Sequence, residues 1–234
     1  MNPPFDPGSA AVGAAAVASV VSMTDIPKEA WITLAQNASD IVKDFLAPLT
    51  STTSGLGRVI SEKFTSKVEL EKVLCADTLR RTQERLLASG KALQGSFDPS
   101  VVIPALDECG RQRDEEIREM WAAILAEELT EGGIHPELVR ALSRLTKFEV
   151  EKLREISTAE YLMTMVLRRG ENHDSAPAQF NFLLGDRNPN GSLRNHILVV
   201  TGLASQDKWG WMELTILGRR LLEIVDTKCD SSHT

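Results

Sequence analysis

The sequence is poor in aromatic residues and in cysteine. Aromatic residues make up 5% of its 234 residues, and Tyr161 is the single tyrosine. Sheet-rich proteins use aromatic and β-branched residues more heavily, so this shortage favours a helical protein. The three cysteines, Cys75, Cys109 and Cys229, are far apart in the sequence and form no CxxC pair. An odd number without a disulfide framework fits a reducing cytoplasm better than secretion, so we expect a cytoplasmic protein.

An excess of positive charge is missing as well. Residues 1–134 carry 13 Lys and Arg against 20 Asp and Glu, and residues 135–234 carry 13 of each kind. Proteins that bind phosphate backbones neutralise them with clusters of basic side chains. The charge balance therefore argues against strong nucleic-acid binding.

The first 24 residues contain a run of small, weakly apolar residues, Ala10 to Val21. A bilayer-spanning helix needs about 20 strongly apolar residues, which this run does not supply. No Lys or Arg precedes it, although a signal peptide needs a basic start. We therefore expect residues 1–24 to form a flexible tail, with a membrane or partner contact as the alternative. Met23 is an alternative start, because a helix signal follows it directly.

Apolar residues spaced three and four apart predict an all-α protein with at most a small β-hairpin. In residues 25–130 we expect a helical domain. Trp121 shares one helix face with Ile117, Ile124 and Leu125, which predicts a core position and not a ligand-stacking one. The acids and bases around the same helix predict a solvated face. The expected helices cover residues 25–48, 56–88, 98–106 with a break or a first-turn position at Pro104, and 113–129.

A second helical domain is expected over residues 135–228. His135-Pro136 is typical of a helix start, which makes a structural role more probable for His135 than catalysis. The patterns Thr146-x-x-Glu149 and Ser157-x-x-Glu160 are capping boxes and predict two successive short helices. The remaining expected segments are a long loop over 170–191, a helix or strand over 196–203, a strand over 209–214 and a last helix from Thr215.

Three stretches in this sequence form an ordered set of motifs. They are Glu-Met-Trp-Ala-Ala-Ile-Leu-Ala at 119–126, His-Pro-Glu-Leu-Val leading to Thr-x-x-Glu at 135–149, and Leu-Thr-Ile-Leu-Gly-Arg-Arg-Leu at 214–221. Together they resemble the abortive-infection alpha (Abi-alpha) family of bacterial phage-resistance proteins, over about residues 40–226. The resemblance implies a role in defence against phage. It carries over no catalytic, cofactor-binding or metal-binding residue.

The third stretch also resembles the end of a winged-helix unit. That pattern requires a buried Leu214 on a strand, Thr215 as a helix cap and Gly218 where the helix packs closely. Many winged helices bind DNA in the major groove. Residues 190–229 hold five bases and four acids, a balance that suits protein contact or dimerisation better than DNA reading.

Enzyme signatures are scarce. The histidines and cysteines lack metal-ligand spacing, and the chain has no Gly-Lys-Ser/Thr phosphate loop and no Gly-x-Ser-x-Gly elbow. Arg168 and His173 have the Arg-x4-His spacing of HEPN-type RNases. The composition predicts about one such match by chance, and Gly170 interrupts the helix between them.

We therefore expect a non-enzymatic interaction or sensor protein without cofactors, acting in abortive infection through a protein partner or as a homo-oligomer. The alternatives are a winged-helix DNA-binding regulator and a HEPN-like RNase toxin. The long 56–88 segment favours an oligomer, because its apolar positions exceed what one neighbouring helix would cover.

Overall fold

The computed structural model describes residues 26–50, 62, 64, 66–93, 97–168, 189–206 and 212–226. These residues form helices and one pair of short strands, so the prediction of an all-α fold with a small hairpin is confirmed. The chain divides into two compact units, residues 1–130 and 131–234, which we describe separately. Among the described helices, none combines the length and apolar character needed to cross a bilayer.

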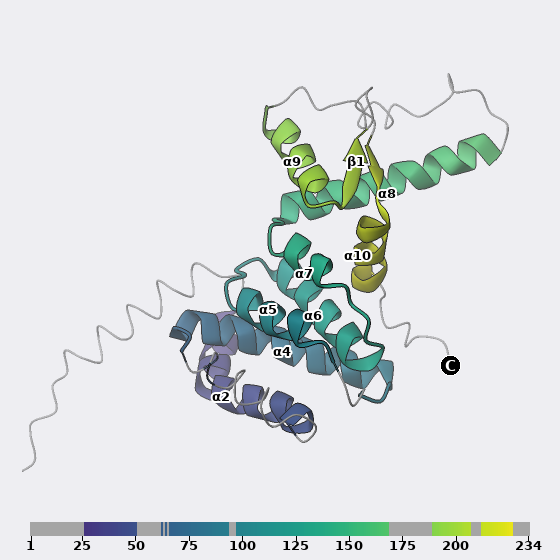
Figure 1. The fold of residues 1–234 in the computed structure, drawn as a ribbon. Helices are drawn as coiled ribbons and strands as arrows, with labels where there is room; N and C mark the ends of the chain where they lie inside the picture. Colours follow the sequence, from purple (N-terminus) through teal and green to yellow (C-terminus); the bar gives the residue numbers. More distant parts are fainter. Residues whose placement is uncertain are drawn as a thin grey trace, which may run out of the picture. The chain divides into compact units, whose positions relative to one another are not determined.

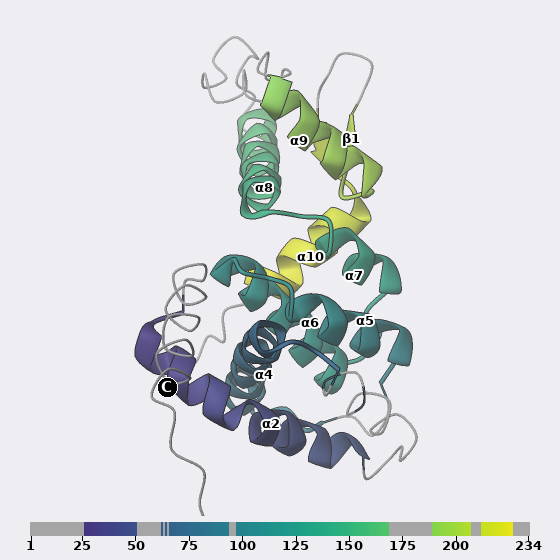
Figure 2. The ribbon, with the colours of Figure 1, turned by 90° about the vertical axis from the view of Figure 1, so that its left-hand side faces the viewer.

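The first unit contains four described helices: α2 (Lys28–Thr50), α4 (Glu69–Ser89), α5 (Pro99–Cys109) and α6 (Glu115–Thr130). Helix α4 lies between α2 and α6 and packs against both, while α5 packs against α4 and α6 (Figures 1 and 2). Helix α6 is buried on almost every side. Trp121 is fully buried among its neighbours on that helix, which confirms the predicted core position.

Local sequence determines where these helices begin and end. The Asp98 side chain accepts a hydrogen bond from the Ser100 backbone N–H at 2.8 Å, directly before Pro99 in the first turn of α5. Asp114 accepts from the backbone N–H of Glu116 at 3.0 Å and so caps α6. Such caps satisfy N–H groups that have no partner within the helix. Gly90 ends α4 with a φ of 62°, a left-handed conformation that glycine adopts without strain.

Two helix predictions in this unit are wrong. The helix expected over 56–88 is interrupted, because Ser66 to Val68 are not helical and α4 starts at Glu69. The break expected at Pro104 is absent, and α5 runs through it. Proline there removes only the backbone bond to Ser100, whose residue is exposed, so water can replace that bond.

The second unit contains α7 (Pro136–Leu142), α8 (Lys147–Arg168), α9 (Pro189–Val200), β1 (Ala204–Gln206), β2 (Met212–Leu214) and α10 (Ile216–Asp226). Strands β1 and β2 pair antiparallel, with Ala204 opposite Leu214 and Gln206 opposite Met212. Helix α8 packs against α9, β2 and α10 (Figure 1). The element order from α9 to α10 is therefore helix, hairpin, helix.

One of the two predicted capping boxes lies at a helix start. The Thr146 backbone N–H donates to Glu149 Oε2 at 2.8 Å, immediately before α8. The second is wrong, because Ser157 lies inside α8, which continues without a joint to Arg168. Ser-x-x-Glu fits a helix interior as well as a cap, and Ile156 and Ala159 bury one side of α8 there.

Several predictions fall on residues that the structure does not describe. These are the tail over 1–24, most of the loop over 170–191 and the residues 209–211 of the expected strand. The predicted end of that loop at residue 191 is wrong, because α9 begins at Pro189. The segment 196–203, left open as helix or strand, is helical as far as Val200.

Candidate functional site

The junction between the hairpin and α10 has the three features that its sequence pattern predicts. Leu214 is buried at the end of β2. Thr215 Oγ1 accepts a hydrogen bond from the Gly218 backbone N–H at 3.1 Å and caps α10. A β-carbon on Gly218 would lie 2.0 Å from the Leu203 carbonyl oxygen, so only glycine fits this approach. These roles are structural, and they position α10 against the hairpin.

The most highly organised polar site in the described part of the first unit is a buried charge network between α4 and α6. Its centre is an ion pair, in which Arg118 Nε donates to Asp77 Oδ2 at 2.8 Å. The two side chains are 1% and 3% exposed. Arg118 Nη1 also donates to the backbone carbonyl of Arg113 at 2.7 Å, ahead of α6.

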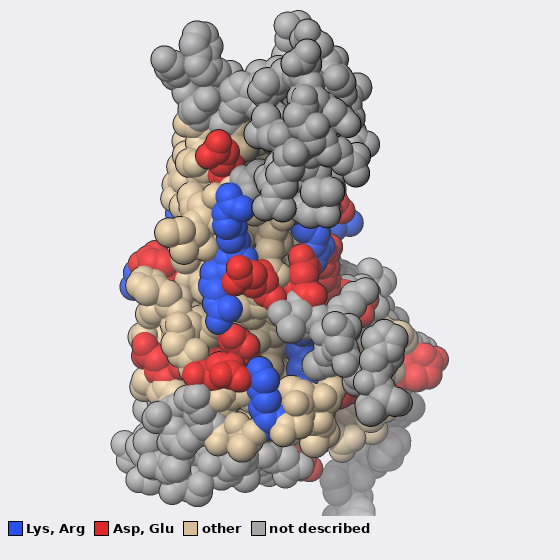
Figure 3. All heavy atoms as spheres, turned by 90° about the vertical axis from the view of Figure 1, so that its right-hand side faces the viewer, with Lys and Arg blue, Asp and Glu red and all other residues tan. Residues whose placement is uncertain are grey.

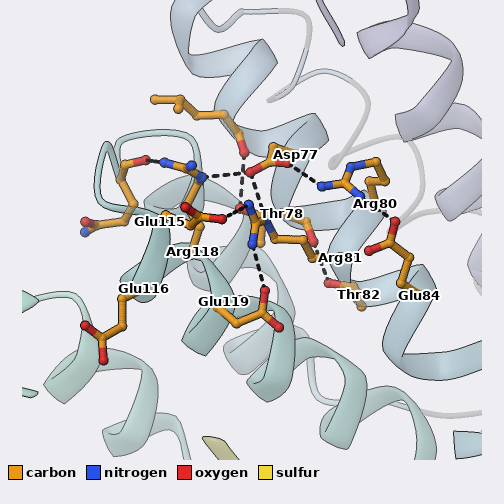
Figure 4. Close-up of polar contacts among 12 residues, drawn as sticks. Asp77, Thr78, Arg80, Arg81, Thr82, Glu84, Glu115, Glu116, Arg118 and Glu119 are labelled. Carbon is orange, nitrogen blue, oxygen red and sulfur yellow. Dashed lines mark hydrogen bonds and ion pairs between the residues drawn. The ribbon is translucent and has the colours of Figure 1, made fainter. Parts of the chain in front are cut away.

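Two further arginines of α4 converge on the same carboxylate (Figure 4). Arg80 Nη2 donates to Asp77 Oδ1 at 2.9 Å, and Arg81 Nε donates to Asp77 Oδ2 at 3.0 Å. They lie three and four residues after Asp77, so one helix face brings them to it. Asp77 thus accepts hydrogen bonds from three guanidinium groups, one of them from α6.

A second layer of pairs extends the network towards solvent. Arg81 donates to Glu115 Oε1 at 2.8 Å and to Glu119 Oε2 at 3.0 Å. Arg85 donates to Glu119 Oε1 at 2.8 Å. Every one of these bonds joins α4 to α6, so the network fastens the two helices at successive turns. Figure 4 shows Arg81 with Glu115 and Glu119.

The arginines keep the carboxylates of Asp77 and Glu119 ionised. Burial alone raises the pKa of Asp77, but the hydrogen bond from Arg80, the charge of Arg81 and the bond and charge of Arg118 outweigh burial and lower it. Burial likewise raises the pKa of Glu119, and the bonds and charges of Arg81 and Arg85 lower it below its ordinary value. A carboxylate with a lowered pKa is a poor proton acceptor at neutral pH, and arginine does not release its proton. The network is therefore suited to holding α4 and α6 together and not to transferring protons.

Sequence reasoning missed this network. It interpreted the charges around α6 as a solvated face, which is wrong for Arg118 and for Glu128, each of which is 1% exposed. Glu128 Oε1 accepts from the Asp98 backbone N–H at 2.7 Å. A usable signal was present, since Asp77 follows the apolar Val73 and Leu74 at helical spacing and therefore lies on the buried face.

The residues that the sequence analysis considered as catalytic candidates do not come together in a site within the described part of the chain. His135 Nδ1 accepts from the Glu137 backbone N–H at 3.2 Å and caps α7, as its predicted structural role requires. Arg168 is the last residue of α8, and His173 lies outside the described residues. Within the described part of the chain, no group of three or more His, Cys, Asp or Glu residues is placed to hold a metal ion.

Comparison with known proteins gives one match. The model of the family described as abortive infection alpha matches residues 69–224, from the first residue of α4 into α10. No curated protein and no solved structure matches the chain. The family match spans more than half of the sequence, and it contains the charge network as well as the capped junction before α10. The chain therefore belongs to the abortive infection alpha family.

Proposed function

We propose that this protein acts in bacterial abortive infection against phage, as a non-enzymatic interaction or sensor protein. The observation that carries the proposal is the family match over residues 69–224, which includes elements of both compact units.

The chemistry of the charge network supports a non-enzymatic role. Asp77 and Arg118 are buried and satisfy each other, and their neighbours form ordered pairs around them. Catalytic acids and bases need a pKa near the working pH and access to a substrate. The lowered pKa and the burial of Asp77 are the opposite of both requirements.

The surface charge supports a protein partner over a nucleic acid. On the face drawn in Figure 3, the basic and acidic side chains of the described residues interleave. In α10, Arg220 pairs with Glu223 at 3.5 Å, and Arg154 of α8 pairs with Asp226 at 3.3 Å. Basic side chains that are paired to acids neutralise fewer phosphates.

A homo-oligomer is one form that this partner could take. The sequence-based motive was the apolar surface of the 56–88 segment. In the structure α4 packs against α2 and α6 of the same chain and buries Val73, Leu74 and Leu79, while Leu87 is 82% exposed. The oligomer therefore stays a prediction. Light scattering across a range of protein concentrations tests it, and a monomer mass throughout would reject it.

Phage plating tests the proposed function. Cells that carry the gene should show fewer plaques than cells with an empty vector, and infected cultures should lose viability before phage are released. Arg80→Met serves as a folded control because its side chain is 42% exposed, and it should protect like the parent. Equal plaque numbers with and without the gene, over a broad phage panel, would reject the proposal.

Two companion measurements test the alternatives. An Arg168→Ala/His173→Ala double variant that folds but loses both protection and RNA cleavage in infected cells would establish the RNase alternative. Sub-micromolar duplex DNA binding at about 150 mM salt would establish the DNA-binding alternative, since binding without specificity is usually far weaker there. We expect the double variant to protect against phage like the parent. We also expect the affinity for duplex DNA to be weaker than sub-micromolar under these conditions.

A further inference from the structure

Two cysteines that are distant in the sequence meet inside the first unit. Cys75 lies on α4 and Cys109 is the last residue of α5, 34 positions later. Their Sγ atoms are 3.5 Å apart, with the Cys109 thiol donating to Cys75 Sγ. Both side chains are buried, at 2% and 0% exposure, and both are free thiols.

We propose that Cys75 and Cys109 are a redox modification site, at which hydrogen peroxide forms a reversible disulfide between α4 and α5. The sulfur atoms, 3.5 Å apart, need to approach by about 1.5 Å, since a disulfide bond is about 2.05 Å long. The inference is independent of the proposed function, because it rests on this thiol pair alone.

The surroundings of the pair suit a small oxidant. Cys109 Sγ also lies 3.4 Å from the Leu106 carbonyl oxygen, and Cys75 Sγ lies 3.9 Å from the same atom. Two thiols that share one acceptor in a closed site leave no space for a bulky disulfide reagent. Hydrogen peroxide is close to water in size, so it can reach the pair during brief local opening.

The reaction balances with peroxide as the only oxidant. The Cys75 thiolate attacks one peroxide oxygen, the O–O bond breaks, and Cys75 becomes a sulfenic acid while hydroxide leaves. The hydroxide takes the Cys109 proton and becomes water. The Cys109 thiolate then attacks the Cys75 sulfur and displaces hydroxide, which takes up the proton that Cys75 released on forming its thiolate and becomes a second water molecule. Two thiols and one peroxide thus give one disulfide and two waters.

The order of attack follows from the hydrogen bond between the two thiols. In this pair Cys109 is the donor and Cys75 Sγ the acceptor, so we assign Cys75 as the first nucleophile. The bond to Cys75 and burial raise the pKa of Cys109 well above its ordinary value, so Cys109 enters second. Lys67, with its side chain 8% exposed, is the nearby cation that opposes this rise. The expected reaction is slow at neutral pH and faster in mild alkali.

The disulfide would join α5 to α4, which is one of the two helices that carry the charge network. Asp77 lies two residues after Cys75 on α4, and Lys67 pairs with Asp107 on α5 at 3.7 Å. A bond between Cys75 and Cys109 would close a loop across both helices and restrict the unfolded chain, which stabilises the folded state. Oxidation should therefore raise the Tm of the chain by several degrees.

Mass spectrometry of the natural chain tests the proposal. The folded protein is treated with hydrogen peroxide, quenched, denatured, alkylated and digested. The expected product is a peptide pair joined through Cys75 and Cys109, lighter by two hydrogens and separated by dithiothreitol. Its yield should rise with pH, and the Tm increase should disappear with dithiothreitol.

Controls make the result decisive. A Cys229→Ser variant removes the only other thiol and should give the same joined peptides. A Cys75→Ala/Cys109→Ala variant should show no peroxide-dependent Tm increase. Alkylation of both cysteines after full peroxide treatment, oxygen adducts on them without a cross-link, or pairing of either with Cys229 in the folded chain would each overturn the proposal.

Discussion

Replacing Arg118 with methionine tests whether burial gives the charge network its strength. The substitution keeps an unbranched side chain in the space of Arg118 but removes its bonds to Asp77 Oδ2 and to the Arg113 carbonyl. Asp77 then remains buried with a negative charge and only two of its three arginine partners. Arg80→Met is the matched comparison, because it removes an arginine from the same carboxylate at similar distance, 2.9 Å against 2.8 Å.

The two substitutions should differ because the two arginines differ in exposure. Removing one partner of a buried ion pair typically costs about 3–5 kcal/mol, and we expect about 3 kcal/mol for Arg118→Met since Arg81 and Arg80 still contact Asp77. The Arg80 side chain is 42% exposed, so water already screens its pair with Asp77. Exposed pairs contribute about 1 kcal/mol or less, and Arg80→Met should cost no more than that.

Urea unfolding followed by far-ultraviolet circular dichroism measures both free energies. The experiment is run at pH 7, with the slope of the transition compared between variants to check that the same structure unfolds. An Arg118→Met cost that exceeds the Arg80→Met cost by less than about 1 kcal/mol would refute the reasoning, because burial would then add nothing beyond a surface pair.

Three further predictions follow from single features. Gly218→Ala should cost about 1–3 kcal/mol of unfolding free energy, since the new β-carbon meets a backbone oxygen, while Ile216→Ala, at 89% exposure, should change it by about 0.5 kcal/mol or less. Trp121→Ala should cost about 3–5 kcal/mol, whereas Trp121→Phe should cost less than half as much because the Trp121 Nε1 has no hydrogen-bond partner among the described residues. Equal losses for the two Trp121 variants would contradict this. The lowered pKa of Asp77 means that its ionised form stabilises the fold, so this contribution should be complete above pH 3.8, the ordinary value, and disappear as acid protonates the folded carboxylate. Denaturant titrations between pH 7 and pH 2 measure it, and an Asp77→Asn variant should show a weaker loss on acidification.

The sequence predicted the elements whose signals are local. Apolar spacing identified α6 and α10, and the capping contacts at Thr146 and Thr215 are made by the side chains expected to make them. The Leu-Thr-x-x-Gly pattern predicted a buried strand end, a cap and a close approach, since each depends on neighbours within about fifteen positions. Local errors came from patterns that fit two contexts, as at Ser157, where the same spacing occurs inside a helix.

The charge network and the thiol pair were beyond this kind of reasoning. Arg118 lies 41 positions after Asp77, and Cys109 lies 34 after Cys75. Their contacts depend on how α4, α5 and α6 pack, which periodicity within one helix does not specify. A charged residue on an otherwise apolar helix face, as at Asp77, indicates a buried partner but not which one.

The hydroxyl of Thr215 has a consequence for how the second unit folds. It donates to the Gly202 carbonyl oxygen at 2.5 Å and accepts from the Gly218 N–H, so one side chain joins the end of α9, the hairpin and α10. The residues that these hydrogen bonds join are 13 positions apart or fewer in the sequence. Loops this short close quickly and at low entropic cost. The β1–β2–α10 segment can therefore form as a nucleus early in folding, and α8, which lies farther away in the chain, adds its apolar side to a surface that already exists.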